Sequence, residues 1–522
     1  MNNLNDIVVG LDIGTTKIAC FIGRRTEGDK IKIIGFGKTD SKGVERGVVK
    51  NVKDTSKSIM RAVNMASEQA GIEVTEVYVG IAGQHIKSQQ NMGTVVIPPE
   101  QRLIKQEDVD RLIEEQHNML LNPGEDIIHI FPQNFVVDGE ELSPDVEPVG
   151  VAGKQLKSNF HIVTGNTVNL RNIHDSVERA GLRIKGVVLE PIASAYAVLD
   201  DDDREAGVAL VDIGGGTTDI AIFKEGIIRH TTVLPLAGNA ITNDIKDGCK
   251  IMRPQAETLK IRFGSCLPQN VSENDIISIP GLHTQQAREI SMRTLAEFIR
   301  TRTETIIEQV DYEIKKSHLE KEIFAGIVLT GGGAQLRHIR ELTEFVTGID
   351  TRIGLPDAHL DKNTAPEIVN TMYSTGIGLV LHGFYEMDRK RRQEMEYADN
   401  NEVDASNEVD ASKEVDAFGV DVTSKNSTQE LDDYGVNDSP KDPDALEPNV
   451  FEELEQVKQS VDEKEEQPAL TKLPKKSKSN DNKGSFWQRT AGRTKEALEL
   501  YFNRVFNDGT IRDEGSDETL GS

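Results

Sequence analysis

The sequence has few cysteines, few aromatic residues and no long apolar run. Its three cysteines, Cys20, Cys249 and Cys266, lack CxxC spacing, which argues against a disulfide framework and is typical of a reducing compartment. Aromatic residues make up only 5% of the 522 positions. No apolar run approaches the roughly 20 residues that span a bilayer, and the first residues lack a charged-then-apolar export pattern. We therefore expect a cytoplasmic protein of two to four domains that does not cross a membrane.

Basic residues are scarce relative to acidic ones, with 60 Lys and Arg against 87 Asp and Glu and a formal net charge of −27. Residues 393–522 hold 32 acidic and 15 basic residues, so the first 392 positions, with 55 acidic and 45 basic residues, carry only −10. Binding to nucleic acid draws on a basic face that releases counterions. We therefore expect no nucleic acid among the partners.

The chain divides into a patterned body and a polar tail. From residue 7 to about 392, strand-like runs such as 7–11, 208–211 and 327–329 alternate with helix-like runs. One helix is expected over 52–70, where apolar residues recur at helical spacing until Gly71 ends the pattern. Strands interleaved with helices predict an α/β architecture built on mixed sheets.

The tail is expected to be a disordered linker followed by a helix. Over 393–485 the composition is acidic and then Lys-rich, and Glu-Val-Asp-Ala occurs three times, starting at 402, 408 and 414. Such a stretch cannot bury enough apolar surface to offset its chain entropy. We interpret it as a solvated spacer.

Residues 486–506 form an amphipathic pattern after this linker, with arginines and glutamates opposite an apolar stripe. The pattern favours a helix lying in the headgroup plane of an anionic membrane. A partner-docking helix and a helix packed on the body are the alternatives. The stripe includes the residues that we expect to enter the membrane, namely Trp487, Leu498, Tyr501, Phe502 and Val505.

An internal repeat is the most informative feature of the body. The segment 8–21 is echoed by 209–223, and in both a buried apolar run ends in Asp-Ile-Gly, turns through Gly and Thr, and resumes as a strand. A single turn of this kind is an ordinary tight hairpin. Two glycine-rich turns can aim backbone N–H groups at phosphate oxygens, because Gly tolerates close approach and unusual φ values. The repeat therefore predicts a phosphate site.

The acidic residues of the repeat predict a metal near that site. Asp12 and Asp212 each end a strand and are expected to flank one Mg²⁺, mostly through its water shell. Lys17 adds a positive charge beside the phosphates. A third glycine cluster at 330–334 follows a buried strand and precedes a helix-like run over 335–345, an arrangement suited to a base and sugar.

Other nucleotide signatures are absent. The stretch 37–39 reads Gly-Lys-Thr, but Lys32 stands where a P-loop needs its first glycine. No Gly-x-Gly-x-x-Gly follows a strand in a dinucleotide-binding setting.

The paired turns and the third glycine cluster resemble the actin, Hsp70 and sugar-kinase ATPase superfamily, and in detail the FtsA family of bacterial cell-division proteins. The resemblance covers nearly all of residues 6–386 and extends to the amphipathic tail. Further stretches that carry it are 150–153, 161–164, 190–196, 238–244, 256–260 and 374–378.

The resemblance implies an actin-like fold of two lobes with ATP and Mg²⁺ in the cleft between them. Glu190 matches the position that orients water in relatives, an ordinary hinge carboxylate being the alternative. Glu257 and Lys260 would reach the ribose and base, although an exposed ion pair fits them as well. The remaining residues implied to bind the nucleotide are Asp12, Gly14, Thr15, Thr16, Lys17, Asp212, Gly214, Gly215, Gly216, Thr217, Gly331, Gly332 and Ala334.

The resemblance also implies a domain plan in which an α+β subdomain interrupts the first lobe. The expected ranges are 6–84 for the core of lobe 1, continued at 164–200 and 370–388; 85–163 for the insert; 206–238 for the core of lobe 2, continued at 316–369; and 239–315 for the upper part of lobe 2.

The function implied is an ATP-binding protein that self-assembles and tethers the division ring to the cytoplasmic face of the inner membrane, with at most slow ATP hydrolysis. The implied partners are the tubulin-like polymer protein FtsZ, further copies of the chain, downstream membrane division proteins and an anionic lipid surface. A small-molecule kinase of the same superfamily is the main alternative, but it has no use for a polybasic amphipathic tail. An Hsp70-like chaperone needs a peptide-binding β-domain that the acidic linker does not offer.

Overall fold

The computed structural model describes residues 7–26, 28, 30–143, 146–279 and 287–392. The predicted linker and the predicted amphipathic helix over 486–506 therefore lie outside the described residues. None of the described helices combines the length and the hydropathy of a membrane-spanning segment.

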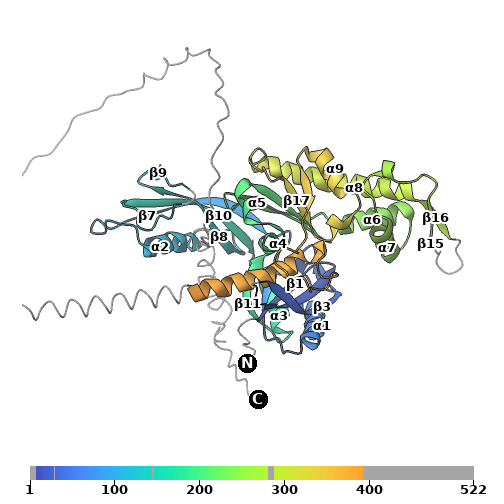
Figure 1. Cartoon of the computed structure of the whole chain (residues 1–522), viewed down its shortest axis with the longest axis horizontal. Coiled ribbons are helices and arrows are strands. Elements are labelled where there is room, and N and C mark those ends of the chain that lie inside the picture. Colours follow the sequence, from blue (N-terminus) through green and yellow to red (C-terminus); the bar gives the residue numbers. More distant parts are fainter. Residues whose placement is uncertain (1–6, 27, 29, 144–145, 280–286, 393–522) are drawn as a thin grey trace, which may run out of the picture. The chain divides into compact units, whose positions relative to one another are not determined.

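The first five-stranded sheet has the order β11-β6-β1-β2-β3. Its strands β11, β1 and β3 are labelled in Figure 1. Its central strand β1 (Ile7–Ile13) is antiparallel to β2 (Lys17–Arg25) and parallel to β6 (Glu76–Ile81). The edges are β3 (Ile31–Asp40) and β11 (Arg183–Leu189). The buried apolar run predicted over 7–11 lies in its central strand, β1.

The second five-stranded sheet repeats this topology in the order β14-β13-β12-β17-β18. Here β12 (Val208–Ile213) is antiparallel to β13 (Thr218–Lys224) and parallel to β17 (Ile327–Thr330). The edges are β14 (Ile227–Leu234) and β18 (Thr351–Ile353). The internal repeat of the sequence is thus the central hairpin of two sheets with the same strand order and directions.

Helix α1 (Val52–Ala70) has the bounds expected from its periodicity. Asn51 caps its N-terminus by accepting a hydrogen bond from the Asp54 N–H, and Gly71 ends it in the left-handed conformation. The helix packs on β3, where a Cβ on Gly35 or Gly37 would overlap the carbonyl oxygen of Ala66 or Ala62. Glycine at these two positions lets the helix and the sheet approach closely.

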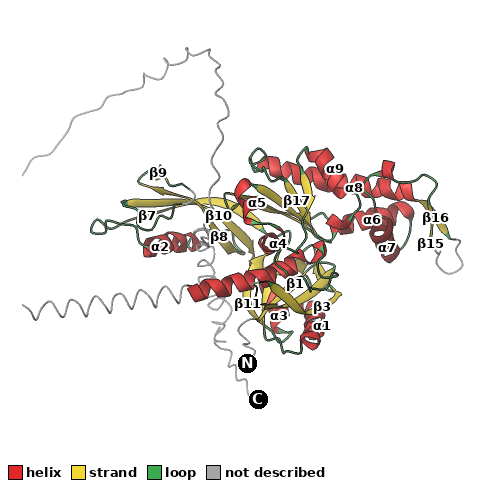
Figure 2. Ribbon diagram, viewed as in Figure 1, coloured by secondary structure: helices red, strands yellow, loops and turns green. Residues whose placement is uncertain are grey.

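Two helices lie between the sheets. They are α4 (Glu190–Val198), labelled in Figure 2, and the helix over residues 374–392, which is orange in Figure 1 and packs on β1. Side chains of β12 alternate between two cores: Leu210 joins the core around these helices, and Val211 joins the core of the second lobe. Both faces of the strand are therefore buried, as its continuous apolar sequence predicts.

A separate α+β unit interrupts the first lobe. It contains β7 (Lys87–Val96), α2 (Gln106–His117), β8 (Glu125–Val137), β9 (Glu140–Glu141) and β10 (Gln155–Asn166), in a sheet of order β7-β10-β8-β9. We call this unit the insert. It has a hydrophobic core of its own, which also takes in Ile227 of β14.

The remaining elements lie around these three sheets. They are β4 (Val44–Glu45), β5 (Val48–Val49), α3 (Thr167–Glu178), α5 (Asp201–Ala206), α6 (Gly238–Cys249), α7 (Arg253–Phe263), η2 (Pro268–Asn270), β15 (Ile276–Ile279), β16 (Arg288–Ser291), α8 (Met292–Lys316), η3 (Gly333–Gln335), α9 (Ile339–Thr347) and η4 (Thr371–Tyr373).

The helix predicted over 335–345 begins later than expected. The glycine turn continues as η3, Leu336 is extended, and α9 starts only at Ile339. The backbone between η3 and α9 forms a hydrogen bond to a distant segment instead. The Arg337 carbonyl oxygen accepts it from the Cys266 N–H at 2.8 Å. This long-range contact replaces the first helical turn that periodicity predicted.

Gly378 offers a test of the packing between the two central helices. A Cβ at this position would overlap the carbonyl oxygen of Ala193 in α4. Gly378→Ala is expected to destabilise the protein by roughly 1–3 kcal/mol, although helix propensity alone favours Ala by about 1 kcal/mol. Thermal unfolding of the variant and the wild type measures this difference in stability. Gly28→Ala, where a Cβ meets nothing within 4 Å, is the control. A Gly378→Ala protein more stable than the wild type would contradict the close contact between Gly378 and α4.

Candidate functional site

The two repeated hairpins have turns of equal length. In the first, Ile13 pairs with Ile18 around the four residues Gly14, Thr15, Thr16 and Lys17, of which Lys17 is also the first residue of β2. In the second, Ile213 pairs with Thr218 around the four turn residues Gly214, Gly215, Gly216 and Thr217. The residues predicted to bind phosphate therefore occupy equivalent positions in the two lobes.

The tips of the two turns face each other. A Cβ on Gly215 would overlap Thr16, and a Cβ on Gly216 would lie 2.5 Å from Thr15 Oγ1. The Gly47 N–H donates a hydrogen bond of 3.0 Å to the same Thr15 oxygen. At this point the backbone of the second turn contacts threonine side chains of the first turn. Because the second turn is made of glycine, its backbone lies within reach of a ligand.

Asp12 and Asp212 lie at the ends of β1 and β12 and are 3% and 8% exposed. Lys17 Nζ donates a hydrogen bond of 2.8 Å to Asp12 Oδ2. Burial lowers the pKa of Lys17, but the charge and hydrogen bond of Asp12, together with Asp212 and Glu190, raise it above its ordinary value. Lys17 therefore stays positively charged between the turns.

Asp219 is a site residue that the sequence reasoning missed. It pairs with Asp212 across the β12–β13 ladder, where the first hairpin has Ala19 opposite Asp12. Thr217 Oγ1 donates to Asp219 Oδ2 at 3.0 Å, while the buried Oδ1 atom has no hydrogen-bond partner in the described part of the chain. Burial and the neighbouring Asp212 raise the pKa of Asp219 to about 8.

Glu190 begins α4, directly after β11, and its side chain lies against Gly80 at the end of β6. Burial, followed by the charges of Asp12, Asp219 and Asp212, raises the pKa of Glu190 well above its ordinary value. The structure thus brings Glu190 together with the acidic residues of both turns.

Two hydroxyl groups position Asp212. Ser194 Oγ of α4 donates to Asp212 Oδ2 at 2.8 Å, and Thr375 Oγ1 donates to the same atom at 3.3 Å. Burial raises the pKa of Asp212, and the Ser194 hydrogen bond opposes that shift. Both residues occur in stretches that carry the family resemblance, but only the fold shows that they meet one carboxylate.

The third glycine turn adjoins the second hairpin. Gly331 has φ +86, and a Cβ there would overlap Asp212 Oδ1. Its N–H donates a hydrogen bond of 3.1 Å to the Thr371 carbonyl oxygen. Gly332 precedes η3, and Ala334 lies buried within η3. This predicted cluster is therefore part of the same site.

Glu257 and Lys260 lie on α7 and contact α6. Lys260 Nζ lies 2.9 Å from Glu257 Oε2 and donates hydrogen bonds to the Gly238 carbonyl oxygen at 3.0 Å and to Thr242 Oγ1 at 2.9 Å. The Gly238 N–H in turn donates to the Gly214 carbonyl oxygen at 3.1 Å. The pair is thus connected to the second turn through the start of α6.

The acidic side chains of the site fit a magnesium ion. The ammonium group of Lys17 interacts with Asp12, Asp212 and Glu190. Asp219 instead lies beside the carboxyl groups of Asp212 and Asp12. Carboxylate oxygens are preferred Mg²⁺ ligands, and Asp219 Oδ1 is an acceptor without a donor among the described residues. A divalent cation would offset the negative charge that raises these pKa values.

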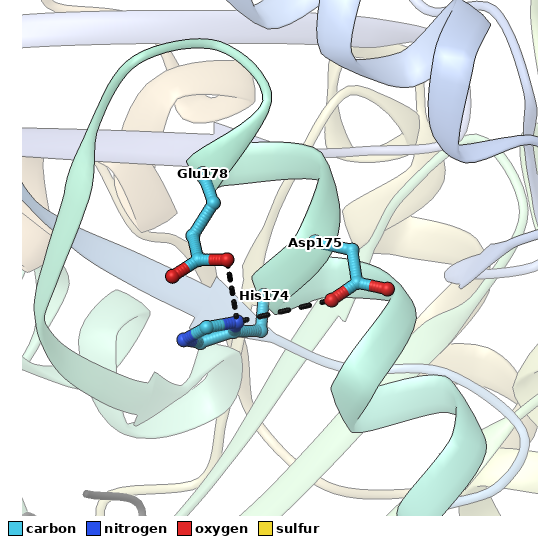
Figure 3. Close-up of side chains that lie close together, drawn as sticks. All are labelled: His174, Asp175 and Glu178. Atoms are coloured by element: carbon cyan, nitrogen blue, oxygen red, sulfur yellow. Dashed lines mark ion pairs between the residues drawn. The ribbon is translucent and has the colours of Figure 1, made fainter. Parts of the chain in front are cut away.

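A second group of potential metal ligands lies on α3, apart from the turns. His174 Nδ1 is 3.6 Å from Glu178 Oε2 and 3.9 Å from Asp175 Oδ1 (Figure 3). All three residues belong to one helix, and the two carboxylates are well exposed to solvent. This arrangement is typical of a helix-surface ion pair, so we assign it no role in the site.

The duplicated sheets and the facing hairpin turns define the class of protein, which has an actin-like, Hsp70-type ATPase fold. A family model described as Hsp70 protein matches residues 166–231. Among solved structures, a chain of the PilM-PilN type IV pilus biogenesis complex is similar in fold, with a TM-score of 0.50 and 15% sequence identity, over 72% of this chain and 98% of that one.

Within this class, two family models and several relatives identify the family. The model described as cell division protein FtsA matches residues 209–378, and the SHS2 domain inserted in FtsA matches residues 83–164. The FtsA protein of Pseudomonas aeruginosa is 38% identical over 377 residues, covering 72% of this chain and 89% of its own length. That of Escherichia coli K12 is 33% identical over 387 residues, covering 72% and 90%. The chain belongs to the FtsA family of cell division proteins.

The raised pKa of Asp219 predicts how stability depends on pH. The folded protein holds a proton that the unfolded chain, with a carboxyl pKa near 3.8, releases. Stability contributed by this group is therefore lost as the pH rises from about 4 to about 8. Asp219→Asn is expected to stabilise the nucleotide-free protein at pH 7.5 by on the order of 1–3 kcal/mol.

Thermal unfolding at pH 5 and pH 7.5 checks this expectation. The variant should lose less stability than the wild type between the two pH values. Glu68→Gln, at an exposed position on α1, is the control and should follow the wild type. An Asp219→Asn protein that is less stable than the wild type at pH 7.5 would contradict the claim that the buried Asp219 carboxyl group destabilises the fold at this pH.

Proposed function

We propose that this protein is an ATP-binding cell-division protein that assembles with further copies of itself and tethers the FtsZ ring to the membrane. The observation that supports it most is the pair of facing glycine turns with buried aspartates at their strand ends. Family membership supports the cellular role, since the matched relatives are cell division proteins.

The turn residues are proposed to hold the phosphates of ATP. Backbone N–H groups of 14–16 and of 215 and 216 would donate to phosphate oxygens from opposite sides, and Lys17 would add a positive charge. The Gly214 N–H closes the second turn by donating to the Thr217 carbonyl oxygen at 2.9 Å. Asp12 and Asp212 would hold Mg²⁺ through its water shell, and the ion would neutralise part of the phosphate charge. Gly331, Gly332 and Ala334 would contact the adenosine, with Glu257 and Lys260 on the side of α6 and α7.

Glu190 is proposed to orient water near the phosphates. The raised pKa of its carboxyl group favours the protonated form, and a protonated carboxyl group does not accept a proton from water. The cation proposed between the turns would oppose this shift, so the raised pKa describes the nucleotide-free site. Hydrolysis is proposed to be slow at most, and the bound nucleotide would serve assembly rather than turnover.

The predicted amphipathic helix over 486–506 is the proposed membrane contact. A single helix of this kind binds an anionic surface modestly, whereas an assembly presents many helices to the same surface and gains avidity. The protein would therefore act peripherally, on the cytoplasmic face at the division site. The upper part of lobe 2, 239–315, is the proposed contact for FtsZ, and downstream membrane division proteins would bind elsewhere on the body.

Replacing both strand-end aspartates tests the nucleotide site. Asp12→Asn with Asp212→Asn is expected to weaken Mg²⁺–ATP binding at least 10-fold, because both carboxylates beside the metal are removed. Isothermal titration calorimetry measures the dissociation constant, and Glu68→Gln on α1 is the control. Unchanged binding in the double variant would contradict the assigned site, and no uptake by the wild type would contradict the proposed function.

Replacing two apolar residues of the tail tests the membrane contact. Trp487→Asp with Phe502→Asp should abolish co-sedimentation of the full chain with vesicles that contain phosphatidylglycerol, since it places charges on the apolar stripe. Glu499→Gln, on the opposite face of the predicted helix, is the control and should sediment at least as well as the wild type. Undiminished sedimentation of the double variant would exclude the tail as the anchor.

A further inference from the structure

His85 lies where the chain enters and leaves the insert. It comes two residues before β7, whose first residue, Lys87, pairs with Thr164 near the end of β10. On the side where the chain leaves, a Cβ on Gly165 would lie 3.4 Å from His85 Cδ2. The imidazole ring therefore sits between the two connections of the insert, at the position of a hinge.

A series of close contacts connects this hinge with the first phosphate turn. Gly47 lies at the tip of the β4–β5 hairpin, and its N–H donates to Thr15 Oγ1 at 3.0 Å. A Cβ on Gly47 would lie 2.6 Å from Gly83 Cα. A Cβ on Gly83 would lie 2.8 Å from the Gly47 carbonyl oxygen and 3.0 Å from His85 Nδ1.

Glycine is required at both positions of this contact. Gly47 has φ +72 and Gly83 has φ +125, values that residues with a side chain rarely adopt. Because Gly83 lacks a Cβ, the Gly47 carbonyl oxygen and His85 Nδ1 both approach the position that a Cβ would occupy. A movement of the β4–β5 tip would therefore act on the His85 ring directly, with no other side chain between them.

The ring nitrogens of His85 are unused in this arrangement. Both Nδ1 and Nε2 are inaccessible to solvent and have no hydrogen-bond partner among the described residues. Burial, and then the charge of Lys50, lowers the pKa of His85 to about 4, so at neutral pH the ring is uncharged and carries one N–H donor. Leaving buried polar atoms unpaired costs stability, and an apolar ring would avoid that cost.

We infer that His85 is a positioning residue that couples the first phosphate turn to the orientation of the insert, by forming a hydrogen bond to the backbone of the β4–β5 tip when phosphate occupies the turn. The inference rests on the proposed nucleotide binding. Contact with phosphate reorients Thr15, the Gly47 tip moves with it, and a ring nitrogen gains its partner. The insert, whose two connections enclose the ring, then changes its orientation relative to lobe 1.

Hydrogen exchange of the full chain with and without Mg²⁺–ATP tests this coupling. In the wild type, ATP should change the exchange rate of amides at 85–90 and 160–166 by on the order of 10-fold. His85→Phe keeps the ring's shape without a donor, so it should bind ATP within about 3-fold of the wild type and lose that change. Its unfolding temperature without nucleotide should not fall, because two unpaired nitrogens are removed.

His85→Gln and His117→Phe complete the experiment. Gln retains a donor and should keep the ATP-dependent change, and it provides the test if the Phe variant does not fold. His117, at the end of α2, has a buried ring nitrogen, Nε2, without a hydrogen-bond partner in the part of the chain that the structure describes. Its Phe variant should respond as the wild type does.

The outcomes separate this inference from the proposed function. A wild type that takes up no ATP in calorimetry overturns the proposed function itself. A wild type that binds ATP without a change at the hinge overturns the coupling. The coupling is also overturned by a Phe variant that responds fully or by a folded Gln variant that does not respond.

Discussion

Several buried carboxyl groups share one lysine between the two hairpin turns, and the site depends on this concentration of charge. Burial and mutual repulsion raise the pKa of Glu190, Asp212 and Asp219, while Lys17 interacts with Asp12 at 2.8 Å. Burying like charges together costs folding free energy, and such a concentration of perturbed groups is typical of functional sites. A cation and its ligand between the turns would remove much of that cost.

The duplicated sheets explain how the carboxyl groups come together. Each central strand carries an aspartate to its end, and the two sheets are joined through α4 and the helix over 374–392, which lie between them. The same helices supply Ser194 and Thr375 to Asp212. The core of the molecule and the positioning of the site are therefore parts of one packing arrangement.

The insert connects the lobes at a second place. It belongs to lobe 1 by its chain connections, yet it binds the edge strand β14 of lobe 2. Ser88 Oγ donates to the Thr231 carbonyl oxygen at 3.0 Å, and Gln133 Nε2 donates to that of Ile228 at 3.0 Å. These hydrogen bonds cover backbone groups that an edge strand otherwise leaves unpaired. A movement between the lobes must therefore be accommodated by the insert and its hinge.

The local pattern of the sequence determined the elements and the position of the turns. Helix α1 has its expected bounds because periodicity, an Asn cap and a Gly stop agree, and the repeat located both strand-end aspartates. Only the tertiary structure decided that Asp219 faces Asp212, that Ser194 and Thr375 meet the same carboxylate, and that α9 begins at Ile339. Strand register and contacts between distant segments set these features, and neither can be read from the spacing of residues along one segment.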